Sequence, residues 1–166
     1  MVTIVVTAFS ISGHAQSAAD NTLKAVITSY LDVKNALTRD NGDSVRTAAK
    51  KLFETIEKTD PEKLPVSERK TWTLYKEKLS YDAAHMKGTS EIEHQREHFM
   101  KFSDNFYKVL KALNINTSDL YYQYCPMAND GKGAYWISEQ EGILNPYFGK
   151  KMLKCGSTKE TLTANH

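Results

Sequence analysis

The chain has 166 residues, enough for one globular domain. Hydrophobic residues make up 40% and charged residues 25%, a composition that excludes disordered and fibrous chains. The formal net charge is only +2, which excludes a nucleic-acid-binding protein built on a basic face. The longest apolar run, Val2–Ile11, is too short to cross a bilayer, so no transmembrane span is expected.

The N-terminal residues resemble an export signal. Val2–Ile11 is apolar apart from small hydroxyl residues, and Gly13-His14-Ala15 then supplies the small-x-small pattern that signal peptidase prefers. No Lys or Arg precedes the apolar run. We predict a signal peptide over residues 1–15 and a periplasmic or otherwise exported protein. The alternative is a short buried strand at Thr3–Ala8.

Residues 20–113 carry the pattern of four amphipathic helices. Apolar residues recur every three or four positions, which places them on one face of each helix. The pattern is interrupted at Asp40-Asn41-Gly42, between Pro61 and Pro65, and at Gly88. Because these connections are short, neighbouring helices are expected to be antiparallel in an up-and-down bundle.

Residues 114–160 lose the helical period. This segment is rich in tyrosine and is interrupted by glycines and by Pro126 and Pro146. We predict an irregular aromatic tail that covers the bundle core, in preference to a docking surface. The predicted fold is therefore all-α: one domain over residues 20–166, with a four-helix bundle and an irregular C-terminal segment packed over it.

Two sulfur motifs frame the tail. Cys125-Pro126-Met127 and Met152-Leu153-Lys154-Cys155 each place a thiol close to a thioether. Such soft donors favour Cu(I), so Cys125, Met127, Met152 and Cys155 are candidate ligands. The alternative is a disulfide between Cys125 and Cys155, because two cysteines usually pair in an oxidising compartment.

Three histidines can add nitrogen ligands. His94 and His98 are four residues apart, so both imidazoles lie on one face of the fourth helix. His85 lies across the short turn at Gly88, and an extended chain from Asn114 can bring Cys125 back to that end. His85 is the preferred nitrogen donor to the sulfur set, and His94 and His98 are secondary candidates. A structural zinc site made by both cysteines and two histidines is the second metal hypothesis.

Several strings of the sequence resemble one family. They are Tyr124-Cys125-Pro126-Met127-Ala128, Asn145-Pro146-Tyr147-Phe148-Gly149, Met152–Gly156, Asp82–Met86 and Ile92–Phe99. Together they resemble an uncharacterised exported domain family, whose members occur alone or fused to CusB-type periplasmic adaptors of heavy-metal efflux pumps. The resemblance implies an exported helical domain associated with copper or related metals. The Cys-Pro-Met string is also similar to the CPMHP motif of metal-binding modules on such adaptors. Here Ala128 and Asn129 stand where that motif has His-Pro, so the imidazole has to come from elsewhere.

We therefore expect an exported protein that binds Cu(I) or Ag(I) without being an enzyme. Its expected partners are the metal ion and a periplasmic efflux adaptor or a metallochaperone. A Cys125–His85 nucleophile–base pair is the enzymatic alternative, but no hydrolase or transferase motif surrounds it. The remaining alternative is a disulfide-closed helical interaction module that binds no metal.

Overall fold

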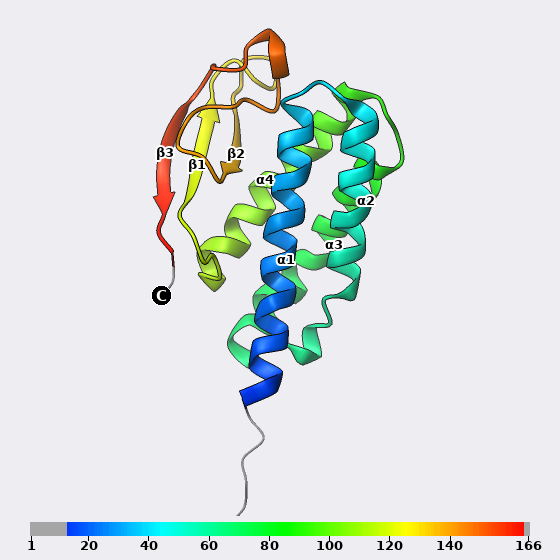
Figure 1. The fold of residues 1–166 in the computed structure, drawn as a ribbon, viewed down its shortest axis with the longest axis vertical. Coiled ribbons are helices and arrows are strands. Elements are labelled where there is room, and N and C mark those ends of the chain that lie inside the picture. Colours follow the sequence, from blue (N-terminus) through cyan, green and yellow to red (C-terminus); the bar gives the residue numbers. More distant parts are fainter. Residues whose placement is uncertain (1–12, 165–166) are drawn as a thin grey trace, which may run out of the picture.

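The computed structural model describes the backbone of residues 13–164 and the side chains of residues 21–164 (Figure 1). The predicted apolar signal segment, Val2–Ile11, lies outside these residues. The predicted cleavage point after Ala15 falls in the first turn of the first helix. In chain order the elements are α1 (Gly13–Leu37), α2 (Gly42–Lys58), η1 (Pro61–Lys63), α3 (Val66–Lys87), α4 (Ile92–Leu113), β1 (Leu120–Cys125), β2 (Ala134–Ser138), η2 (Gly149–Lys151) and β3 (Ser157–Leu162).

The four predicted helices are confirmed, and they run alternately up and down (Figure 1). Consecutive helices pack against each other because each carries one apolar stripe that has to be buried. The α1–α2 connection is short because Asn41 caps α2: its side-chain oxygen accepts a hydrogen bond from Ser44 N at 2.9 Å.

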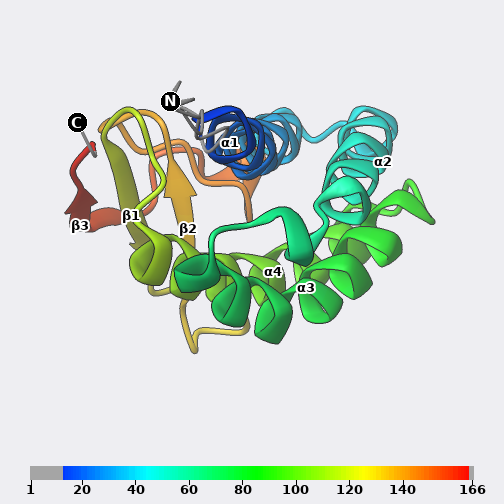
Figure 2. The same ribbon diagram turned by 90° about the horizontal axis from the view of Figure 1, so that it is seen from below.

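The all-α prediction is wrong, because the C-terminal segment forms a three-stranded antiparallel sheet and the fold is mixed α/β. The strand order is β2-β1-β3, so the central strand pairs with both of the others. The sheet lies on the side of the bundle that α1 and α4 form, away from α2 (Figure 2). The residues that the sequence analysis placed in an irregular tail are therefore ordered by backbone pairing.

The sheet was missed because aromatic residues occupy both of its faces. On one face, the Tyr122 ring lies between Tyr107 of α4 and Tyr135 of β2, with ring centroids 3.8 and 4.7 Å away. On the other face, Trp136 and Gln123 are fully buried. The Gln123 side chain donates to the carbonyls of residues 140 and 141 in the segment that covers this face. Strands β1 and β2, which are covered on both faces, therefore lack the clear apolar–polar alternation by which strands are recognised in a sequence.

One hydrophobic core joins the helices and the sheet. Tyr30 of α1 is at its centre, with its ring stacked on Phe99 and Phe102 of α4 at 5.1 and 5.7 Å. The Tyr30 hydroxyl contacts Ser103 Oγ at 2.8 Å and accepts a hydrogen bond from Ile137 N of β2 at 3.0 Å. Burial raises the pKa of this phenol well above its usual value, so Tyr30 stays neutral.

The Asn145–Gly149 turn fastens the C-terminal segment to the helices. Asn145 Oδ1 accepts a hydrogen bond from Tyr147 N at 2.8 Å, which closes the turn. The Pro146 carbonyl accepts a hydrogen bond from Arg96 Nε of α4 at 3.0 Å. Gly149 has a φ of +52°, and a Cβ here would lie 2.0 Å from Asp40 Oδ1, so only glycine fits. The Asn-Pro-Tyr-Phe-Gly string therefore has a structural role at this contact.

Arg96 completes this contact from the helical side. Its guanidinium pairs with Asp40 at 2.5 Å and with Glu93 at 2.8 Å. Asp40 also accepts a hydrogen bond from Lys150 N at 2.9 Å. Although burial by itself would raise the pKa of Asp40, these donors hold it below its usual value. Arg96 thus links the end of α1, the second turn of α4 and the C-terminal segment.

Within the part of the chain that the structure describes, none of the helices combines the length and the apolar character needed to cross a membrane.

Candidate metal centre

Three histidines form a cluster where α3 ends and α4 begins. His85, His94 and His98 each offer one ring nitrogen, and these three atoms all lie within 4.8 Å of one another. The rings of His85 and His98 are stacked with their centroids 4.2 Å apart. The His94 ring is 4.7 Å from His98 and 5.8 Å from His85. We call these residues the histidine triad.

The helical hairpin positions the triad locally. His94 and His98 are one helical turn apart on α4, while His85 is two residues from the end of α3. Gln95 fixes the turn between the helices: its side-chain amide donates to Thr89 O at 2.7 Å and to Met86 O at 3.3 Å. The α3–α4 angle at the triad is therefore held by a buried side chain.

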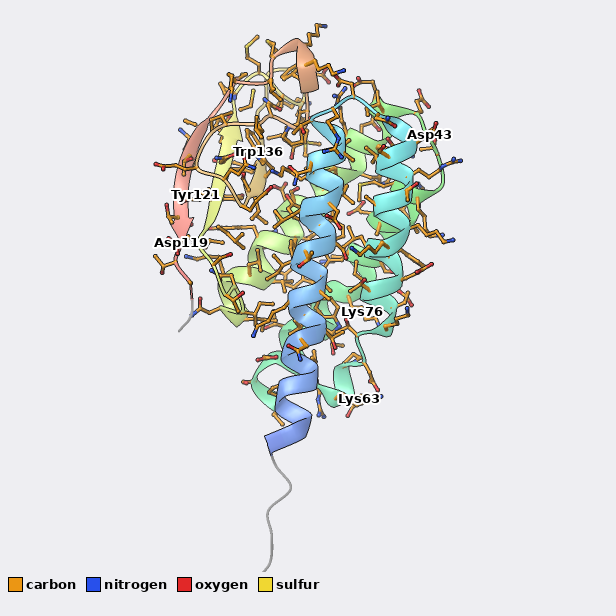
Figure 3. All side chains as sticks on the ribbon, in the orientation of Figure 1. Asp43, Lys63, Lys76, Asp119, Tyr121 and Trp136 are labelled. Carbon is orange, nitrogen blue, oxygen red and sulfur yellow. The ribbon has the colours of Figure 1, made fainter. Side chains whose placement is uncertain are left out.

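The same amide connects this turn to the neighbouring α1–α2 turn. Gln95 Nε2 also donates to Gly42 O at 2.9 Å. A Cβ on Gly42 would lie 1.9 Å from Ser90 O, so the two turns can pack this closely only with glycine here. Asp43, labelled at the start of α2 in Figure 3, accepts a hydrogen bond from Ser90 Oγ at 2.6 Å. Both turns therefore support the end of the bundle that carries the triad.

A buried carboxylate orients one of the three histidines. Asp82 Oδ1 lies 2.8 Å from His98 Nδ1, and both side chains are buried. When Asp82 accepts a hydrogen bond from the Nδ1–H group of a neutral His98, the ring lone pair lies on Nε2. Metal-binding histidines usually have such a carboxylate partner, which fixes the ring and makes the imidazole a stronger ligand. Burial raises the pKa of Asp82, and the hydrogen bond and charge of His98 only partly offset this.

The electrostatics of the cluster favour a neutral imidazole at His85. Its pKa is below the usual value, first because of desolvation and then because His98 and His94 repel a second positive charge. Lys101 acts in the same direction, and Asp82 opposes it. A metal ion binds the neutral form of histidine. Because the pKa of His85 is lowered, its imidazole stays neutral, and able to bind a metal, down to a lower pH.

The donor set fits a transition-metal ion. Imidazole nitrogen suits copper, zinc, nickel and iron, and it bonds zinc at about 2.0–2.1 Å. A tetrahedral ion at such distances holds its nitrogens roughly 3.3 Å apart, so small rotations of the three rings would complete the geometry. Three protein ligands leave one position for an exchangeable ligand. Tyr81, whose ring is 4.4 Å from His85, is 59% exposed and places the triad close to solvent.

The two cysteines predicted as metal ligands do not belong to the histidine triad. Cys125 Sγ and Cys155 Sγ lie 2.7 Å apart, both as free thiols. Among the described residues, the triad forms the one group of three or more His, Cys, Asp and Glu ligand atoms with metal-site spacing, and it contains neither cysteine. The structure thus brings the cysteines together and the histidines together, but it does not group His85 with both sulfur atoms.

The two methionines differ in their surroundings. The Met127 side chain is 56% exposed and lines a cavity of about 470 Å³ beside Glu97, Met100 and Lys101 of α4. Met152 is half-buried after η2, and its carbonyl accepts a hydrogen bond from Cys155 N at 3.1 Å. Neither methionine belongs to the histidine triad.

Sequence reasoning did not assign roles to Asp82 and Gln95. One signal for Asp82 was available: it precedes His85 by three residues, so both lie on the same helix face, next to the buried Ala83 and Met86. A carboxylate at a buried position needs a partner, and histidine was the nearest one. Gln95 gave no such signal, because its three acceptors are backbone carbonyls of two separate turns.

The family of this chain is identified by its helical part. The family described as "Protein of unknown function (DUF3347)" matches residues 26–118, more than half of the chain. The chain belongs to this family, which confirms the prediction of an uncharacterised domain family. The match covers the triad and ends before the cysteine strings. No curated protein and no solved structure matches the chain significantly.

Proposed function

We propose that this protein is an exported copper-binding protein, and that His85, His94 and His98 hold the ion. The observation that carries the proposal is the convergence of three imidazole nitrogens within 4.8 Å, next to a buried carboxylate on His98. Metal-binding histidines commonly have such a partner, and two further imidazole nitrogens lie beside this one.

Copper is the preferred ion for two reasons. Affinity for nitrogen ligands rises along the first-row divalent ions to copper and then falls at zinc. The resemblance to domains fused to heavy-metal efflux adaptors also favours copper, the metal with which that resemblance is associated. Zinc is the principal competitor, because three histidines and an open position also suit zinc.

The ion is proposed as cargo and not as a catalytic cofactor. The centre is close to the surface, and its open position can accept a ligand from another protein. In this proposal the protein takes up copper in the periplasm and passes it to an efflux adaptor or a metallochaperone. The exported location rests on the predicted signal segment and on the resemblance described above.

The test is a metal titration of the purified full chain. Cu(I) under anaerobic conditions with a competing chelator, Cu(II) and Zn(II) are compared in separate titrations. We expect one copper ion per chain, bound more tightly than zinc. Paramagnetic resonance of the Cu(II) form should show coupling to imidazole nitrogens.

The variants assign the ligands. His94→Ala should weaken copper binding by at least about 100-fold, beyond the roughly 10–100-fold loss typical of an outer-shell partner. Glu97→Ala is the matched control, because Glu97 is exposed on the same helix and should leave the affinity unchanged. A triple alanine variant of the triad that still binds copper like the wild type would overturn the proposed site. Tighter binding of zinc than of copper would overturn the choice of metal.

A further inference from the structure

The cysteine pair stands apart from the histidine triad and has its own geometry. Cys125 is the last residue of β1, and Cys155 lies two residues before β3. Because β1 and β3 pair with Tyr124 opposite Ser157, the sheet register brings the two cysteines side by side. Their Sγ atoms are 2.7 Å apart, within roughly 0.7 Å of the disulfide bond length of about 2.05 Å.

The backbone around Cys155 is fixed in this position. Asn145 Nδ2 donates to the Cys155 carbonyl at 2.8 Å, and Cys155 N donates to Met152 O at 3.1 Å. The next residue, Gly156, has a φ of +140°, and a Cβ here would lie 2.8 Å from Tyr124 O. This close approach of the two backbones depends on glycine, and it holds the Cys155 thiol against Cys125.

The two thiols differ in accessibility. Cys125 is completely buried, whereas Cys155 is only half-buried. The hydrogen bond with Cys125, together with burial, raises the pKa of Cys155 to about 11. Only a thiolate attacks a disulfide, so this high pKa slows the reaction of Cys155, and it is accessibility that selects Cys155 as the first thiol to react.

We infer that Cys125 and Cys155 form an intramolecular disulfide through a mixed disulfide at Cys155, with Cys125 as the resolving cysteine. This modification goes beyond the proposed copper function, since it rests on the sheet register and not on the triad. The oxidant is a small or protein disulfide, the class of reagent found in exporting compartments.

The reaction proceeds in two exchanges. Cys155 loses its proton and attacks one sulfur of the oxidant, which forms a mixed disulfide and releases the first oxidant thiolate. Cys125 then loses its proton and attacks the sulfur of Cys155, which releases the second thiolate. The protein gives up two protons and two electrons, and the oxidant is reduced to two thiols. The order follows from burial, because an external disulfide can reach Cys155 but not Cys125.

The first experiment measures closure of the pair in the full chain. Reduced protein is treated with oxidised glutathione, the remaining thiols are alkylated, and the intact mass is determined. We expect complete loss of both free thiols, a mass lower by two hydrogen atoms, and a Cys125–Cys155 cross-link in a non-reducing digest. Two thiols that stay free, or a disulfide between two chains, would overturn the inference.

The second experiment measures the order of reaction. Cys125→Ser should accumulate a stable glutathione adduct at Cys155. Cys155→Ser should react at Cys125 at least tenfold more slowly, because the thiol is buried. Equal rates would refute the assigned roles. Should either variant fail to fold by circular dichroism, rapid acid quenching of the wild-type reaction replaces it, with the transient adduct expected on Cys155 and an adduct on Cys125 contradicting the order.

Discussion

The histidine triad and the cysteine pair are assembled by two regions that obey different rules. The triad is made by a helical hairpin: two of its histidines are one turn apart on α4, and the third is across a short connection. The cysteine pair is made by a sheet, and its two residues are separated by 30 positions along the chain. Helical neighbours follow from a fixed spacing, whereas strand partners follow from a register that the entire sheet determines.

The histidine triad and the cysteine pair also differ in solvent exposure. His85 and His94 are half-buried, which suits an exchangeable ion. Cys125 is fully buried and its partner is fixed by a backbone turn, which suits a permanent bond. Arg96 connects the regions, because it lies between His94 and His98 in the sequence and binds the Pro146 carbonyl of the C-terminal segment.

The largest effect on stability is expected from replacing Arg96. Arg96→Met removes the guanidinium from a part-buried ion pair with Asp40 and from buried hydrogen bonds to the Pro146 and Leu37 carbonyls, and it should lower the free energy of unfolding by about 3–5 kcal/mol. Urea unfolding measures the loss. Arg46→Met is the matched control, because its ion pair with Asp43 is exposed and should change stability by less than about 1 kcal/mol. Equal effects of both substitutions would refute the linking role of Arg96.

The next effect separates the cysteine pair from the proposed copper site. Cys125→Ala combined with Cys155→Ala opens a ring of about 30 residues, and should lower stability relative to the oxidised wild type by about 3–4 kcal/mol on the chain-entropy view. Urea unfolding with and without reductant tests this, and reduced wild type should resemble the double variant. Copper affinity should stay the same. A double variant that loses copper would place the ion at sulfur.

A smaller effect is expected at the carboxylate beside the triad. Asp82→Asn keeps the size of the side chain but removes its negative charge, so the partner of His98 becomes a weaker, neutral acceptor. Copper affinity should fall by about 10–100-fold while the stoichiometry stays at one ion per chain. Competition titration measures the change. Glu93→Gln, on the exposed side of α4, should bind copper as the wild type does. Unchanged affinity in Asp82→Asn would show that the Asp82 carboxylate does not support the proposed copper site.

The smallest effect concerns pH. Copper competes with protons for the imidazoles, so affinity should fall as the pH decreases through and below the usual histidine pKa of about 6.5. Desolvation and the charges of His94, His98 and Lys101 lower the pKa of His85, while Asp82 opposes this shift. Lys101→Gln removes one of the charges that lower the pKa of His85. His85 should therefore become protonated at a slightly higher pH, and the copper affinity of this variant should begin to fall there. Titrations at several pH values test this, and a pH-independent affinity would contradict histidine ligation.

The sequence by itself determined the helical half of the molecule. Apolar residues at intervals of three and four, together with breaks at Gly42, Pro61 and Gly88, define four helices, because helix formation depends on residues close in the chain. The same local rule placed His94 and His98 on one face and His85 across a short turn. The grouping of these three residues could therefore have been ranked above the sulfur set on spacing alone.

Only the tertiary structure decided the rest. Strands β1 and β2 were hidden because the half-buried Tyr122 and the buried Trp136 cover opposite faces of the sheet, so these two strands show no clear alternation. The contact between Cys125 and Cys155 depends on the β1–β3 register, and the role of Asp82 depends on the packing of α3 against α4. These contacts join residues that are distant in the chain, and their geometry follows from the collective packing of the whole core, which no short stretch of sequence specifies.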